Sequence, residues 1–593
     1  MSSFASLRAS RDARLAPTRH GVGSASDPAS SASGSATAQA AGTPSDQAVV
    51  TACTSTSSAA IAGTTTTPSP ATMALFPDLA PSPLEVRTSP TSGRGLYATR
   101  SITAGSTILV TQPLVGAVST ANLQQTCSGC FSASKKVSRC AACKALHYCS
   151  AQCQRQDWAQ HKTECAALTR LRGMWARAYP DRARAGGDWT QVANMESHAK
   201  SLPEADKMKL ASQVQHLRHY LSAATPDPED PDTLHPADMA EYGFTSALEL
   251  LDMCSAFSVN SFTLSTGDLT PVGVATSPLC ALFNHSCEPN AVVVFPRAGR
   301  GMHVVAISDI SQGQEVLTSY IDVSLPYAER QDDLLERYGF TCACPLCTRN
   351  ADLGWADPRW CLLHRGCKSG GRGRVPNLRH DGQATVRCSC TKTFTVDVPQ
   401  LKNLVESGKS VLAQDERGTL DPSTALSTLT SLVPRLAGLM PPSAHPLLQL
   451  LRLHALLLTP PATAVQQAEV ATLLTAAAQG ARESHPENHP TVGVILATRA
   501  KVMAMDVDGA VGAAGAAAVG RPVVAPQGDD SLGRVMLSPE GRRAKLDQLA
   551  ACVGALRDAS AACDLGFGHG GEVSEDLQSV LVGCERELDM LRR

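Results

Sequence analysis

Apolar positions recur at helical spacing along the last third of the chain. After the helix start signal at Ser538 and Pro539, one apolar stripe consists of Leu546, Leu549, Val553 and Leu556. A second stripe follows Ser574 and consists of Leu577, Val580, Leu581, Cys584, Leu588 and Leu591. Such stripes are typical of helices that bury one face. We therefore predict a helical C-terminal domain over residues 421–593, interrupted by a Gly/Ala/Pro-rich loop at residues 506–530.

The middle of the chain changes from helical to strand-like patterns. An apolar stripe of four residues, Leu210, Val214, Leu217 and Leu221, and a shorter helical run at residues 247–253 predict a helical region over residues 166–255. Strand candidates follow at residues 291–295 and 302–307. Just before them, the apolar run 279–283 stops at the polar segment 284–290, which reads Asn-His-Ser-Cys-Glu-Pro-Asn. This pattern predicts a buried strand end that presents polar side chains to a site.

Residues 1–82 carry no such pattern and consist mostly of Ser, Ala, Thr, Gly and Pro. This composition buries too little apolar area to offset backbone ordering, so we predict a disordered tail. The alternative is a mitochondrial presequence, because Arg8, Arg11, Arg14 and Arg19 lie among serines with few acids. The tail is favoured, since Pro17 and the Gly/Ser tract limit an amphipathic helix.

Length and charge narrow the class of protein. A chain of 593 residues is too long for one core, so two to four folded units are expected. The formal net charge of -2 gives no electrostatic argument that the protein binds nucleic acid. With no run of eighteen apolar residues, a membrane span is not expected. We expect a soluble monomer in the nucleus, the cytoplasm or both.

The 21 cysteines carry the strongest local signal. Most fall in closely spaced pairs, which favours zinc in a reducing compartment over secreted disulfides. Within residues 127–165, eight soft ligands supply two closed tetrahedral shells: Cys127, Cys130, Cys140, Cys143, Cys149, Cys153, His161 and Cys165. We expect metal to supply much of the folding energy of this short segment.

A later group of soft residues has irregular spacing. It consists of Cys361, His364, Cys367, Cys388 and Cys390, within residues 351–420, which we interpret as a linker or as a Cys-containing segment of unassigned structure. A further metal site is one interpretation, but the irregular spacing favours a structural role without metal.

Several motifs together resemble a known family. The ligand order in residues 127–165, with His147-Tyr148-Cys149 and Trp158 near His161, closely resembles a MYND zinc finger. Further motifs in register are Ser92-Gly-Arg-Gly-Leu, Asn260-Ser-Phe, the segment 284–290, Leu317-Thr-Ser-Tyr and Tyr338-x-Phe-x-Cys-x-Cys-x2-Cys. Over residues 84–347 the chain is similar to the SET-and-MYND family of protein-lysine methyltransferases.

The resemblance implies an α+β organisation. A SET-domain β-fold would be split between residues 84–126 and 256–340, with the MYND finger at 127–165 inserted and a post-SET zinc segment at 341–350. The C-terminal helices would form a tetratricopeptide-like domain. In the finger, Cys127, Cys130, Cys149 and Cys153 would hold one zinc and Cys140, Cys143, His161 and Cys165 another. A third zinc would be held by Cys287, Cys342, Cys344 and Cys347.

The resemblance also implies roles around an S-adenosylmethionine pocket. The residues expected to bind the methyl donor are Gly93, Arg94, Gly95, Asn260, Asn284, His285, Tyr320 and Phe340. Phe262, Tyr320 and Tyr338 would surround the lysine channel, where a poorly hydrated aromatic wall disfavours the ammonium form of the amine. Tyr320 is expected to supply the catalytic hydroxyl by orienting the amine.

Two functions remain open at this point. The first is a chromatin-regulating lysine methyltransferase that acts on histone or other protein substrates. The second is an adaptor that binds proline-containing peptides through the MYND finger while its SET domain is weak or silent. The joint presence of Asn260, Asn284, His285, Tyr320 and Tyr338 favours the enzyme, because an adaptor would not require that set.

Overall fold

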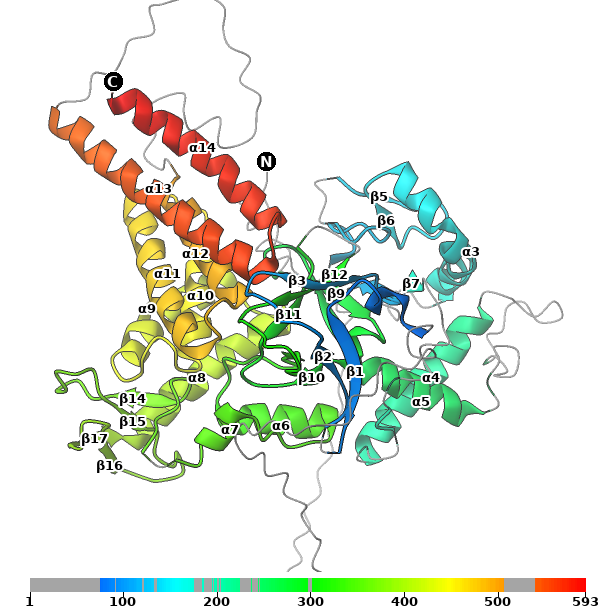
Figure 1. The fold of residues 1–593 in the computed structure, drawn as a ribbon, viewed down its shortest axis with the longest axis horizontal. Coiled ribbons are helices and arrows are strands. Elements are labelled where there is room, and N and C mark those ends of the chain that lie inside the picture. The colour runs from blue at the N-terminus through cyan, green and yellow to red at the C-terminus, as the bar shows by residue number, and fades with distance from the viewer. Residues whose placement is uncertain are drawn as a thin grey trace, which may run out of the picture.

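The computed structural model describes residues 75–592, apart from 91, 120–121, 133–135, 175–183, 186–194, 196, 200–201, 203, 224–235, 237–243, 245, 297–300, 353 and 506–538. Most of the expected disordered tail and the expected loop at 506–530 lie outside the described residues. Figure 1 shows a central group of strands, with the C-terminal helices on one side and the cysteine-rich finger on the other.

The folded chain begins earlier than the expected boundary near residue 84. A short 3-10 helix, η1 (Pro77–Leu79), follows Phe76. Phe76 is 3% exposed and Leu79 is 1% exposed, and both belong to the core of the strand region. Two isolated apolar residues in a Pro-rich segment show no periodicity, which is why the sequence pattern did not reveal them.

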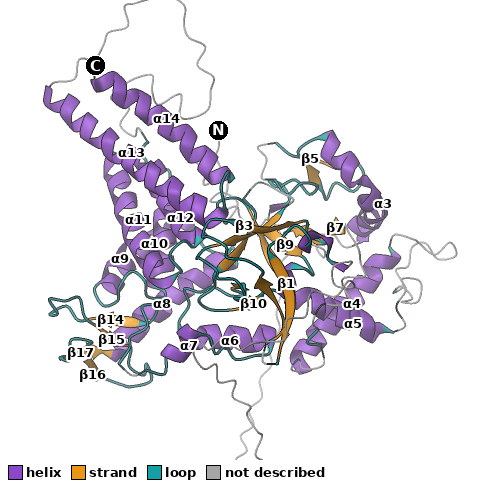
Figure 2. Ribbon diagram, in the orientation of Figure 1, coloured by secondary structure: helices purple, strands orange, loops and turns teal. Residues whose placement is uncertain are grey.

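Small sheets make up the strand region. The hairpin β1 (Leu84–Ser89) and β2 (Gly93–Ala98) is antiparallel, and Gly93 adopts the positive φ of 70° at the turn. A three-stranded sheet has the order β11 (Ala291–Val294), β12 (Met302–Ala306), β3 (Thr107–Thr111). A four-stranded sheet has the order β7 (Arg184–Ala185), β4 (Val115–Val118), β9 (Pro271–Thr276), β8 (Ser261–Ser265). Figure 2 shows these strands at the centre of the molecule.

One strand pair is parallel and very short. β10 (Asn284–His285) pairs with β13 (Leu317–Thr318), so two segments about thirty residues apart lie side by side. The apolar residues that precede β10 form η5 (Cys280–Leu282) and end at Phe283, which is fully buried. The prediction of a buried segment that ends in polar residues is therefore confirmed, although it is a 3-10 turn and not a long strand.

The cysteine-rich finger is inserted between β4 and the later strands. It contains β5 (Ser138–Arg139), β6 (His147–Tyr148) and α3 (Ala151–Met174). The helices α4 (Glu204–Ser222) and α5 (Ala247–Val259) follow and pack against each other through Leu250 and Val214. The predicted helical stripe of α4 thus faces α5.

The segment at residues 351–420 is folded, so its interpretation as a linker is wrong. It contains two antiparallel hairpins and a helix: β14 (Cys361–Leu363) with β15 (Arg372–Arg374), β16 (Gln383–Arg387) with β17 (Thr393–Asp397), and α8 (Val398–Glu416). Because these strands have only three to five residues each, alternation was too short to predict them.

The C-terminal region is helical, as predicted. Its helices are α9 (Pro422–Ala437), α10 (Leu447–Leu457), α11 (Ala464–Ser484), α12 (Pro490–Met503), α13 (Pro539–Phe567) and α14 (Glu572–Arg592). From α9 onward each helix packs against the next in sequence order. The stripe residues Leu549, Val553 and Leu577 are buried in their shared core. No helix in the described part of the chain is long and apolar enough to cross a membrane.

Candidate functional site

Asn290 holds the parallel strand pair together. Its side-chain amide donates to the carbonyl of Glu315 at 2.9 Å, and its side-chain oxygen accepts from the backbone N–H of Leu317 at 2.8 Å. The backbone N–H of Asn290 also donates to the carbonyl of Leu317. One buried amide therefore fixes the register of β10 against β13, and with it the position of the residues that follow β13.

Asn284 connects this strand pair to the edge of β2. Its amide donates to Glu315 Oε1 at 2.7 Å and to the carbonyl of Arg94 at 3.1 Å. A Cβ at Gly95 would lie 2.8 Å from Asn284 Nδ2 and closer still to Glu315 Oε1. Glycine at position 95 is therefore required by the close approach of the partly buried Asn284–Glu315 pair.

His285 uses both ring nitrogens inside the protein. Nδ1 accepts from the backbone N–H of Tyr320 at 3.1 Å, and Nε2 lies 3.3 Å from Cys287 Sγ. A neutral ring with its proton on Nε2 satisfies both contacts. The side chain is thus positioned as a link between Tyr320 and the cysteine cluster.

An aromatic cluster surrounds His285. The ring of Tyr320 lies 5.0 Å from that of Tyr338 and 5.3 Å from that of His285, and it meets Phe340 edge-on at 6.4 Å. The Tyr320 hydroxyl donates to the carbonyl of Phe283 at 2.8 Å, and the Tyr338 hydroxyl donates to the carbonyl of Tyr320 at 3.3 Å. Burial raises the pKa of Tyr320 above its ordinary value. The phenol therefore stays protonated at neutral pH and acts as a donor, not as a base.

Two residues that were expected at the site, Phe262 and Asn260, do not belong to the aromatic cluster around His285. Phe262, on β8, packs against the core of the strand region, whereas Tyr320 and Tyr338 belong to the cluster around Cys287. Asn260 is the C-cap of α5, and its amide donates to the carbonyl of Ala256 at 2.7 Å. Asn260 therefore fixes the helix end from which β8 departs.

The third predicted ligand set comes together beside these rings. The ligand atoms of Cys287, Cys342, Cys344 and Cys347 lie within 4.8 Å of one another, and the sulfurs of Cys287 and Cys347 are 3.6 Å apart. Helix α6 (Tyr327–Tyr338) lies between Cys287 and Cys342 in the sequence and ends at Gly339, which has a φ of 71°. Helix α7 (Pro345–Arg349) begins with Pro345 and carries Cys347. The left-handed turn at Gly339 directs the chain back toward Cys287.

A buried arginine lies against this cluster. Arg330, on α6, is 0% exposed, and its Nη1 lies 3.8 Å from Asp357 Oδ2. The negative charge of the Cys287 and Cys347 thiolates and of Asp357 raises the pKa of Arg330 against the effect of burial. A four-thiolate zinc site carries a net charge of about -2, so Arg330 compensates part of it.

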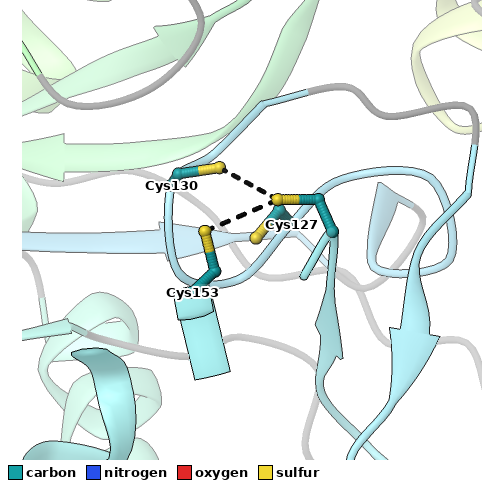
Figure 3. Close-up of side chains that lie close together, drawn as sticks. Cys127, Cys130 and Cys153 are labelled. Carbon is teal, nitrogen blue, oxygen red and sulfur yellow. Dashed lines mark hydrogen bonds between the residues drawn. The ribbon is translucent and has the colours of Figure 1, made fainter. Parts of the chain in front are cut away.

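The finger contains the two interleaved ligand sets. One set is Cys127, Cys130, Cys149 and Cys153; the other is Cys140, Cys143, His161 and Cys165. Figure 3 shows the sulfurs of Cys130 and Cys153 turned toward the sulfur of Cys127. His161 directs Nε2 at Cys140 and Cys143, at 3.5 and 3.6 Å, and its Nδ1 lies 3.2 Å from Glu164 Oε2. A carboxylate behind a ligating imidazole is a common orienting arrangement in zinc sites.

These separations fit zinc. A tetrahedral ion with Zn–S bonds of about 2.3 Å places its sulfurs about 3.8 Å apart. The sulfurs of Cys130 and Cys149 are 3.7 Å apart, and those of Cys140 and Cys165 are 3.8 Å apart. With four ligands each, all three sets would be closed structural sites.

The structure gathers a fourth set that the sequence did not favour as a metal site. His364, Cys367, Cys388 and Cys390 place their ligand atoms within 4.8 Å of one another. Cys361, the fifth residue of that irregular group, lies outside the set and is buried near the carbonyl of Pro358. The irregular spacing hides this proximity because the four residues come from two separate hairpins.

Three residues of the site were missed by sequence reasoning: Asn290 as a strand clamp, Glu315 as the partner of Asn284, and Arg330 as the charge behind the third cluster. The available signals were weak: Asn290 ends the polar segment 284–290, and Glu315 follows a turn at Gly313. Arg330 gave no signal, because it lies in a helix rich in charged residues whose other charges are exposed.

Sequence comparison places these motifs within a known domain family. The family model of the SET domain matches residues 93–321. Within this chain, residues 93–321 are thus similar to SET domains, and similar curated proteins include ones named as SMYD2 methyltransferases and as a SET domain and MYND-type zinc finger protein.

The N-lysine methyltransferase SMYD2 of Gallus gallus is 32% identical over 284 residues, covering 45% of this chain and 60% of the relative. SMYD2 of Homo sapiens is 31% identical over 281 residues, with the same coverage of 45% and 60%. The SET domain and MYND-type zinc finger protein 6 of Schizosaccharomyces pombe is 30% identical, covering 47% of this chain and 55% of the relative. The chain thus spans about 60% of the length of the first two relatives.

Proposed function

We propose that this protein transfers a methyl group from S-adenosylmethionine to the side-chain amine of a lysine in a protein substrate. The observation that carries the proposal is the ring cluster of Tyr320, Tyr338, Phe340 and His285. This cluster adjoins the edge of β2 at which Asn284, the neighbour of His285, donates to the carbonyl of Arg94. The relatives named as N-lysine methyltransferases support the same activity. The methyl donor, when bound, supplies a methyl group on a positively charged sulfur.

The residues near this edge fit the chemistry of the donor. Asn260, Asn284 and Phe340 are only partly buried, so polar and aromatic faces remain accessible. A Cβ at Gly93 would meet no atom within 4 Å, so a ligand can approach the main chain at this point of β2. We assign the donor to the space beside Gly93–Gly95, Asn284 and Phe340.

The chain's own residues would prepare the lysine amine. A protonated amine has no free lone pair, and a poorly hydrated aromatic surface favours the neutral form. Tyr320 and Tyr338 provide such a surface, and their two tilted rings are mutually fixed by packing. The raised pKa of Tyr320 keeps its hydroxyl protonated, so it orients the reacting groups and does not remove a proton.

The test is incubation with radiolabelled methyl donor and a histone mixture or cell extract. Tyr320→Phe should abolish label on lysine, whereas Tyr327→Phe, a tyrosine of the same cluster without an assigned role, should retain it. Binding of S-adenosylhomocysteine, measured by calorimetry, should persist in both variants.

Donor binding without label on any protein would overturn the enzymatic proposal. That outcome would favour the adaptor function, in which the finger binds partner peptides and the SET domain is silent. Equal labelling by wild type and Tyr320→Phe would leave methyl transfer in place but remove Tyr320 from its assigned role.

A further inference from the structure

We propose that His364, Cys367, Cys388 and Cys390 form a fourth zinc site, which builds the two-hairpin unit of residues 361–397 and ties it to the rest of the protein. This inference does not depend on methyl transfer. It rests on four soft ligands that two separate hairpins bring within 4.8 Å of one another.

The ligands come in two pairs, each at the end of a hairpin. His364 and Cys367 lie in the turn between β14 and β15, where the N–H of Cys367 donates to the carbonyl of His364 at 2.9 Å. Cys388 and Cys390 lie between β16 and β17, where the N–H of Cys390 points at Cys388 Sγ at 3.5 Å. Backbone N–H groups directed at sulfur stabilise a thiolate, the form that binds zinc.

The distances and the packing fit a metal better than an apolar core. His364 Nδ1 lies 3.6 Å from Cys390 Sγ, close to the separation of about 3.5 Å expected between nitrogen and sulfur on one tetrahedral zinc. The His364 ring stacks on Phe394 with centroids 5.0 Å apart and planes at 6°, which fixes the direction of Nδ1. One nitrogen and three sulfurs form a ligand set that zinc favours, and four ligands close the shell.

Gly371 lies where the main chain comes closest to the sulfurs of Cys367 and Cys388. A Cβ at Gly371 would lie 2.8 Å from Cys367 Sγ and closer still to Cys388 Sγ. The unit thus brings three thiols and the main chain into a space that no larger residue permits. Without an ion, these thiols would gain little from being so close, because neutral sulfurs form only weak hydrogen bonds.

The unit has little else to hold it together. Its strands have three to five residues, and two-stranded sheets of this size are marginal in water. Its buried apolar side chains, Leu362, Val386 and Val396, belong to the core shared with the C-terminal helices. A metal would therefore supply folding energy that the small hairpins lack.

The unit joins two parts of the molecule. Arg374 donates to the carbonyls of Asn350 and Asp352, just after the third cluster. On the other side, the N–H of Leu363 donates to the carbonyl of Leu439 at 2.8 Å, and Arg372 pairs with Glu483 at 2.8 Å. A zinc in this unit would thus fasten the segment after Cys347 to helices α9 to α11.

The first test is zinc content by mass spectrometry after loading with excess zinc and desalting. Wild type should hold four zincs per chain, and Cys388→Ala should hold one fewer. Cys361→Ala is the matched control, since Cys361 is buried in the same unit but lies outside the ligand set; its count should equal that of wild type. A Cys388→Ala protein with an unchanged count would overturn the proposal.

A second measurement needs no variant, in case Cys388→Ala fails to fold. Alkylation of the wild-type protein is followed at each cysteine by peptide mass spectrometry. Cys367 and Cys390 are partly exposed and should react slowly with zinc bound and rapidly after chelation, whereas Cys254, which belongs to no ligand set, should react equally in both. Equal rates at Cys367 and Cys390 with and without zinc would overturn the proposal, as would a disulfide within the set.

Discussion

Nε2 of His285 lies 3.3 Å from Sγ of Cys287, while the other nitrogen of the same ring accepts a hydrogen bond from the backbone of Tyr320. One imidazole therefore connects the third cysteine cluster to the tyrosine that we place beside the substrate. Its neutral tautomer donates to the sulfur and accepts from the backbone N–H. The metal cluster and the aromatic cluster are thus positioned by the same side chain.

Loss of Cys287 should affect both clusters. Cys287→Ser is expected to lower the zinc content by one per chain and, because His285 loses its partner, to lower methyl transfer by about ten-fold or more. Zinc is measured by mass spectrometry and transfer with labelled donor. Cys280→Ala is the control, since Cys280 is equally buried but belongs to no ligand set. An unchanged zinc count in Cys287→Ser would remove Cys287 from the metal site.

A methyl group at position 95 should disturb the donor site. In Gly95→Ala the new Cβ would displace Asn284 or Glu315 and break their 2.7 Å hydrogen bond. The loss of one partly buried hydrogen bond to a carboxylate costs about 1–2 kcal/mol, so we expect S-adenosylhomocysteine to bind about ten-fold more weakly by calorimetry.

The control for this substitution is Gly554→Ala. A Cβ at Gly554 on α13 meets nothing within 4 Å. In a helix interior this change should leave ligand binding unchanged and add at most about 1 kcal/mol of stability. Wild-type affinity in Gly95→Ala would contradict the assignment of this edge.

Removal of the buried arginine should weaken the fold around the third cluster. Arg330→Gln removes the positive charge that faces the thiolates of Cys287 and Cys347, while Asp357 keeps its ion pair with Arg359. Breaking such a buried arrangement costs about 3–5 kcal/mol, measured by urea unfolding with and without a zinc chelator. The exposed Arg417→Gln is the control and should change stability by less than about 0.5 kcal/mol. Equal stability of the two variants would mean that Arg330 compensates no charge.

Two neighbouring histidines, His485, which is buried, and His489, which is half-buried, should make stability depend on pH. His485 and His489 lie with ring centroids 4.8 Å apart between α11 and α12. Burial lowers the pKa of His485 to about 4 and lowers the pKa of His489 well below its usual value. In the unfolded chain both would titrate near a pKa of about 6.5. Between these values the unfolded state binds more protons, so stability is complete above pH ~6.5 and falls as the pH falls toward 4.

The expected loss at pH ~5.5 is about 1 kcal/mol for each histidine. Unfolding by urea at pH ~7.5 and ~5.5 measures it in wild type and in His485→Gln, which should lose less on acidification. The exposed His569→Gln should behave as wild type. Any loss of zinc at low pH is common to all three proteins. The same pH dependence in His485→Gln as in wild type would show that His485 is not buried in its neutral form.

Local patterns were sufficient for several parts of the protein. The apolar stripes around Leu549 and Leu577 predicted α13 and α14, because a helix repeats its buried face within a few residues. The spacing of the eight soft ligands in residues 127–165 predicted metal, whereas the division into ligand sets, and the inclusion of Cys287 in the third, came from the family resemblance. The polar segment after Phe283 was visible as a break in hydrophobicity.

The sequence by itself determined which residue types stand at the site and in which order. Only the tertiary structure decided that Asn290 clamps β13, that Glu315 faces Asn284, that Arg330 lies behind the cysteines, and that His364 meets Cys388. Asn290 and Leu317, Asn284 and Glu315, and His364 and Cys388 are separated by 24 to 31 residues, and Arg330 is 43 residues from Cys287, so nothing in local spacing specifies these contacts. Their contacts result from strand pairing and from the burial of charge in a shared core, which depend on the whole fold.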